Sequence, residues 1–87
     1  MNELPIDDDR LLQEMTACLG TLYFPEKTDD DTIHELATNE FHRVKGIICR
    51  QYNFDEDEYI SENCGVSPFD FVCDDVESEV YKRIRYD

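Results

Sequence analysis

Basic residues, histidines and glycines are scarce in this chain, and each shortage excludes a kind of site. Eight lysines and arginines among 87 residues are too few for the positively charged surface that direct nucleic-acid binding uses. Two histidines and three glycines form no H-E-x-x-H pair and no glycine-rich phosphate loop, and there is no nucleophile elbow. The sequence therefore predicts that the protein is not an enzyme.

Ligand sets for metal ions are also lacking. The closest cysteines, Cys64 and Cys73, lie nine residues apart, whereas zinc signatures pair ligands at spacings such as C-x₂₋₄-C. Counting an EF-hand loop from Asp29 or Asp55 places apolar or aromatic residues where oxygen ligands are needed. We therefore expect no cofactor and no metal.

Long apolar runs are absent as well. No stretch approaches the roughly 20 apolar residues of a membrane span, and the start of the chain has no positive n-region or apolar h-region. A strongly acidic surface is also repelled by anionic lipid. We expect a cytoplasmic protein that does not bind membranes, and its four cysteines are then expected to be reduced.

What the chain has in excess is negative charge. Twenty-two acidic residues give a formal net charge of −14, whereas solubility asks for a magnitude of only about 2–8 in a small domain. Residues 1–31 hold nine acids and two bases, 32–54 two and three, and 55–87 eleven and three. Like charges destabilise a compact state. The concentration of acidic residues in the first and last segments therefore indicates a basic partner.

Apolar spacing predicts helices in most of the chain, which we interpret as one acidic helical domain over residues 1–87. The expected helices run from about Asp8 to Tyr23, Asp31 to Tyr52, Glu56 to Asn63, and from Ser67 to near the C-terminus. The fold class predicted is all-α, a small bundle of about four helices with a short third one. The alternative is α+β, with Phe69–Cys73 or Val80–Tyr86 as a short strand.

The expected fourth helix carries a regular acidic stripe. Asp70, Asp74 and Glu77 follow at spacings of four and three, with Tyr81 continuing the row, and such neighbours have Cβ atoms about 5–6 Å apart. Acidic clusters at helix starts could extend this array, although capping alone also explains individual clusters. The candidate partner-binding residues are Asp29, Asp30, Asp31, Asp55, Glu56, Asp57, Glu58, Tyr59, Asp70, Asp74, Glu77 and Tyr81.

Glu40 departs from the pattern, because it falls inside the apolar stripe of the expected second helix. A carboxylate buried there is costly unless it is paired or protonated. We expect Glu40 to lie at the edge of the stripe or to pair with an arginine. The alternative is that it marks a gap in which a partner docks.

Two functional hypotheses follow from the charge pattern. In the first, the protein mimics nucleic acid and blocks the DNA- or RNA-binding cleft of a basic protein. In size and charge the chain is similar to small acidic phage proteins of the anti-CRISPR and anti-restriction classes, which implies the host cell cytoplasm as its location. Duplex DNA presents one charge per roughly 1.7 Å of axis, which spaced carboxylates can imitate.

In the second hypothesis the protein is an immunity protein or antitoxin that neutralises a basic nuclease toxin. Asp55 to Ile60 resembles the short third helix of colicin-type nuclease immunity proteins in being acidic and then aromatic. The tyrosine pair followed by proline that marks the family's binding helix is absent. A third hypothesis, an adaptor subunit, rests on the five tyrosines and five phenylalanines available for an interface. Whether the chain is a monomer or a homodimer stays undetermined.

Overall fold

The structure is a computed structural model that describes residues 2–86. In chain order it contains α1 (Asp8–Cys18), β1 (Leu22–Phe24), α2 (Asp30–Gln51), α3 (Glu56–Glu62), a 3₁₀ turn η1 (Pro68–Phe71), α4 (Cys73–Lys82) and β2 (Ile84–Tyr86). The predicted four-helix fold with a short third helix is confirmed. The C-terminal strand that we gave as the alternative is also present, although it covers only the last three residues of Val80–Tyr86.

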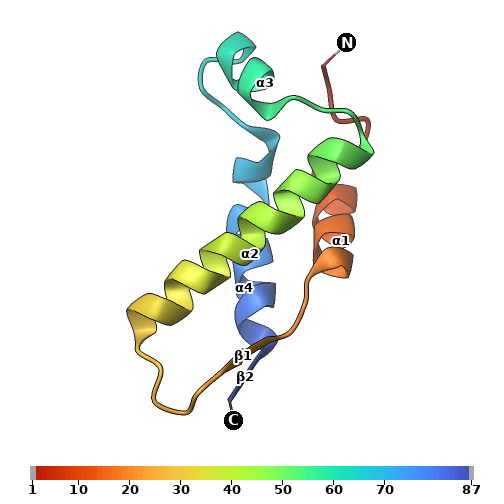
Figure 1. Ribbon diagram of the computed structural model, residues 1–87. Helices are drawn as coiled ribbons and strands as arrows, with labels where there is room; N and C mark the ends of the chain where they lie inside the picture. Colours follow the sequence, from red (N-terminus) through yellow and green to blue (C-terminus); the bar gives the residue numbers. More distant parts are fainter. Residues whose placement is uncertain (1, 87) are drawn as a thin grey trace.

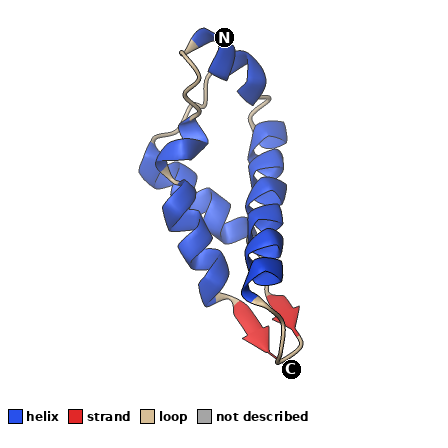
Figure 2. Ribbon diagram, turned by 90° about the vertical axis from the view of Figure 1, so that its left-hand side faces the viewer, coloured by secondary structure: helices blue, strands red, loops and turns tan. Residues whose placement is uncertain are grey.

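Three helices pack side by side along an elongated body of 46 × 22 × 18 Å (Figure 1). α1 and α4 run in the direction opposite to α2 (Figure 1). α3 lies at one end of the long body, and the two strands lie at the opposite end (Figure 2). The main core lies where these helices meet and consists of Leu11, Met15, Phe41, Val44, Ile48, Phe54, Phe69, Val72 and Val76.

The predicted first helix is wrong beyond Cys18. Leu19 is extended (φ −69°, ψ 137°), and residues Leu22–Phe24 form β1 instead of a last helical turn. β1 pairs in parallel with β2, with Leu22 opposite Ile84. Phe24 and Ile84 are buried together with Ile33 of α2 in a second apolar cluster. The packing of this cluster explains why an apolar and aromatic segment after Gly20 is a strand.

The predicted fourth helix is interrupted. Ser67 caps the start of the segment and Pro68 opens it, but the capped element is the turn η1 and not a long helix. Ser67 and Asp70 form the capping box of η1. Val72 (φ −117°, ψ 0°) separates η1 from α4, which has no side-chain cap. The strand proposed for Phe69–Cys73 is therefore wrong.

The other helix ends follow the sequence closely. Asp29 caps α2 by accepting a hydrogen bond from the backbone N–H of Thr32, and Asn53 (φ 51°) follows its end. Asp55 caps α3 by accepting one from the N–H of Glu58. Gly65 (φ 83°) lies in the turn after α3, where a left-handed conformation favours glycine.

Candidate functional site

The acidic residues divide into those paired within the fold and those facing solvent without a base. In the described range 2–86, five ion pairs occupy five basic residues but only four carboxylates, those of Glu14, Glu40, Glu56 and Glu79. Among residues 2–86, every aspartate lies outside these pairs. Five of the eight basic residues are therefore paired with glutamates. Some aspartates accept hydrogen bonds as helix caps, but none of those described has its charge offset by an ion pair.

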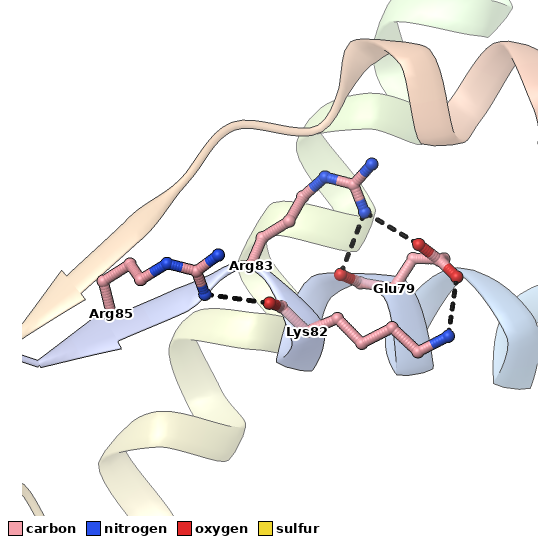
Figure 3. A network of polar contacts seen from close by, with 4 residues as sticks. All are labelled: Glu79, Lys82, Arg83 and Arg85. Carbon is pink, nitrogen blue, oxygen red and sulfur yellow. Dashed lines mark hydrogen bonds and ion pairs between the residues drawn. The ribbon is translucent and has the colours of Figure 1, made fainter.

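Basic residues near the C-terminus show this pairing clearly (Figure 3). Glu79 accepts a hydrogen bond from Lys82 at 3.1 Å and from Arg83 at 2.9 Å, and these two contacts, Arg83 first, lower the pKa of Glu79. Arg85 donates to the backbone carbonyl of Lys82 at 3.0 Å. At the end of α4, the side chains of Lys82 and Arg83 thus contact one carboxylate, and the side chain of Arg85 contacts the backbone.

The cluster Asp29–Asp31 stands at the start of α2. Asp29 is engaged by Thr32, whose hydrogen bonds lower the pKa of the Asp29 carboxyl. Asp30 and Asp31 are exposed in the first turn and have no ion pair. Their charge faces the positive end of the helix dipole, so this cluster serves α2 and also presents two carboxylates to solvent.

The cluster Asp55–Glu58 lies at the other end of α2, about 33 Å away for a helix of 22 residues. Glu56 is occupied within the fold: it pairs with Lys45 at 3.0 Å and accepts a hydrogen bond from the Ser67 hydroxyl at 2.6 Å. Asp57 and Glu58 are exposed. Glu56 and the capping residue Asp55 therefore belong to the internal structure, and Asp57 and Glu58 are the available members of the cluster.

Tyr59 points mainly into the molecule. Its ring lies 5.5 Å from the ring of Phe54, centroid to centroid, and it packs half-buried against the main core. Of the Tyr59 side chain, only the part that lines a cleft beside α3 is open to contact with a partner.

The acidic stripe is shorter than the sequence predicted, because Asp70 lies in η1 and not in α4. The Asp70 carboxylate accepts a hydrogen bond from the N–H of Ser67 at 3.2 Å. Asp74 and Glu77 remain one turn apart on α4, and Tyr81 continues the row with its hydroxyl 3.1 Å from Nδ1 of His34. The rigid part of the predicted stripe is therefore Asp74, Glu77 and Tyr81.

One group of side chains on α4 has ligand atoms close enough for a cation. Atoms of Cys73, Asp74 and Glu77 lie within 4.8 Å of one another. Burial, followed by the negative charge of Glu77, raises the pKa of the Cys73 thiol, so the thiolate that binds metal ions is disfavoured. Three ligand atoms from one helical turn also fall short of the six to eight oxygens that calcium takes.

A cleft that the sequence did not predict lies at the α3 end of the molecule. It has a volume of about 710 Å³ and is lined by the N-terminal segment, α3 and η1. The side chain of Asn2 connects the N-terminal segment to the start of α3. It donates a hydrogen bond to the backbone carbonyl of Asp55 at 2.6 Å and accepts one from the N–H of Asp55 at 2.8 Å. This contact joins residues 53 positions apart, which no local pattern reveals.

The structure thus places the candidate residues along the length of the molecule, with Asp29–Asp31 at one end, Asp55–Glu58 at the other and the α4 row between them (Figure 1). No helix among residues 2–86 has the length and apolar character needed to cross a bilayer. Comparison of the chain with known protein families, curated proteins and solved structures finds no match in any of the three.

Proposed function

We propose that this protein is an inhibitor that occupies the nucleic-acid-binding cleft of a basic protein and competes there with DNA or RNA. The observation that carries the proposal is the spread of base-free carboxylates over a long, narrow body. Averaged over all sides of the body, the 14 net negative charges along the 46 Å length correspond to about one charge per 3.3 Å, which is about half the linear charge density of duplex DNA. A single DNA strand carries one phosphate per about 3.4 Å.

The position of several of these carboxylates on helices also supports the proposal. Asp31, Asp57 and Asp74 each lie in the first turn of a different helix, and the short aspartate side chain has few rotatable bonds. Their carboxylates are therefore held in place before a partner arrives, which reduces the ordering cost of association. A flexible acidic tail of equal charge would have to be ordered on binding.

A second candidate, an immunity protein for a basic nuclease, is favoured by α3. This helix has only seven residues and begins with three acids in its first turn, as the resemblance to colicin-type immunity proteins implies. Such a protein binds one cognate toxin through an interface with buried aromatic anchors. That kind of interface tolerates moderate salt, whereas a phosphate-like contact weakens steeply as salt rises.

The test is displacement. The immobilised protein is incubated with nuclease-treated cell lysate, and the retained basic protein is then challenged with duplex DNA, with RNA, or with an unfolded polyglutamate of equal charge. We expect nucleic acid to release the retained protein, polyglutamate to do so far less, and binding to fall about 100-fold or more between 50 and 200 mM salt.

A variant carrying Asp31→Asn, Asp57→Asn and Asp74→Asn is expected to bind the retained protein at least about tenfold more weakly. The matched control removes three exposed charges outside the candidate residues and the cleft, with Asp9→Asn, Glu26→Gln and Glu35→Gln, and should lose less. A retained partner that nucleic acid never displaces and that survives moderate salt would reject mimicry in favour of immunity.

A further inference from the structure

The cleft at the α3 end combines features that a solvated helix surface lacks. Five of its eleven lining residues are apolar or aromatic, namely Leu4, Ile6, Tyr59, Pro68 and Phe71. Phe71 on η1 is 65% exposed, so most of its ring has no cover within the fold. An uncovered phenylalanine in a concave site is a surface that a partner's side chain can complete.

The same cleft is strongly acidic. Its lining includes four acidic residues, Glu3, Asp8, Glu58 and Glu62, and it includes no lysine, arginine or histidine. None of these four acids is in an ion pair among residues 2–86. The cleft is therefore complementary in charge to a cation, and its apolar residues are complementary to the stem of a long side chain.

We propose that this cleft receives an arginine side chain of the basic partner. The guanidinium group faces the carboxylates, and the aliphatic stem and the planar head pack against Phe71. Arginine suits the site better than lysine, because its weakly hydrated planar head stacks on aromatic faces and binds carboxylates with two hydrogen bonds. The partner's basic character is taken from the proposed function, but the chemistry of the cleft can be tested without that partner.

The probe is tetra-arginine amide, with tetra-lysine amide as the comparison, titrated into the full chain and followed by amide chemical shifts and by calorimetry. We expect the largest shifts at Glu58, Tyr59, Glu62 and Phe71, and tighter binding of the arginine peptide. Shifts distributed evenly along the molecule would overturn the inference, since they would report attraction to net charge alone.

Matched variants separate the cleft from the overall charge. Glu58→Gln with Glu62→Gln should weaken the arginine peptide about tenfold, whereas Asp30→Asn with Asp31→Asn, which removes the same charge at the far end, should weaken it less than about twofold. Phe71→Ala should reduce the preference for arginine over lysine, and Tyr23→Ala, also at an exposed aromatic, should not. All four sites are exposed, and circular dichroism verifies that each variant is folded.

The two proposals fail separately. Equal losses for the two double variants would overturn the arginine site, even if nucleic acid still displaces the protein from its target. Selective loss for the cleft variants would support the arginine site, even if the retained partner turns out to bind no nucleic acid.

Discussion

At the scale of single residues, Glu40 connects the segment after α1 to α2. Its side chain is 7% exposed, and its carboxylate accepts hydrogen bonds from Arg43 at 2.6 and 2.8 Å and from the backbone N–H of Gly20 at 2.7 Å. Arg43 also donates to the carbonyl of Cys18 at 3.0 Å. The expected pairing with an arginine is thus confirmed. The alternative, in which Glu40 marks a gap for a partner, does not apply, because Arg43 and the backbone of Gly20 already contact its carboxylate.

Glu40→Gln should destabilise the protein by about 2 kcal/mol at neutral pH, since a charged hydrogen-bond acceptor is lost from a buried position while Arg43 stays partly exposed. Glu35→Gln, on an exposed position of the same helix, is the control and should change stability by less than about 0.5 kcal/mol. Urea unfolding measures both. An equal effect at the two positions would contradict the role given to Glu40.

The effect of Glu40 should depend on pH in a defined direction. Its pKa is lowered, first by the hydrogen bonds from Arg43 and against the opposing effect of burial. A carboxyl with a lowered pKa stabilises the fold at pH values above the unfolded pKa, near 4.5, and loses this contribution as the pH falls below it. The stability difference between the wild type and Glu40→Gln should therefore shrink in acid.

At the scale of elements, Ser67 joins α3 to the rest of the molecule. It is 2% exposed, its hydroxyl donates to Glu56 at 2.6 Å, and the same oxygen accepts from the N–H of Phe69 at 3.2 Å. Lys45 of α2 holds the same Glu56 carboxylate. A chain of polar contacts therefore runs from α2 through α3 to η1.

Ser67→Ala should lower the free energy of unfolding by about 1–2 kcal/mol, because it removes the cap, leaves the buried N–H of Phe69 without its acceptor and takes one hydrogen bond from Glu56. For a domain of this size each kcal/mol corresponds to about 4–8 °C in Tm. Ser61→Ala, on the exposed surface of α3, is the control and should leave Tm nearly unchanged. If both variants melt alike, Ser67 does not have this connecting role.

Local patterns predicted those elements whose signals are local. Caps at Asp29, Asp55 and Ser67 were readable because the acceptor and the N–H lie two or three residues apart. The strand Leu22–Phe24 was not readable, since its partner Ile84–Tyr86 is about 60 residues away. The break at Val72 falls where Phe69 and Val72 are both buried in the core, and the cleft includes Asn2, which contacts the distant Asp55; neither feature has a local signal.

At the scale of the whole molecule, the charge that would serve binding also acts on the fold. With a body only 22 and 18 Å across its short axes, every carboxylate lies within about 30 Å of many others, which is the screening length at 0.01 M salt. Within the part of the chain that the structure describes, only four carboxylates are offset by ion pairs. Self-repulsion should therefore exceed internal attraction, and screening should favour the folded state.

We expect Tm to rise by several degrees between 0.01 and 1 M sodium chloride, because the screening length falls from about 30 to 3 Å. The variant carrying Asp31→Asn, Asp57→Asn and Asp74→Asn should melt higher at low salt and gain less from added salt, since it has fewer charges to screen. Arg83→Gln is the opposite control: it frees the Glu79 carboxylate from its 2.9 Å contact and should steepen the dependence. Thermal melts at four salt concentrations measure all three slopes. A wild-type Tm that falls as salt is added would mean that the ion pairs outweigh the repulsion, and the surplus carboxylates would then require no basic partner to explain them.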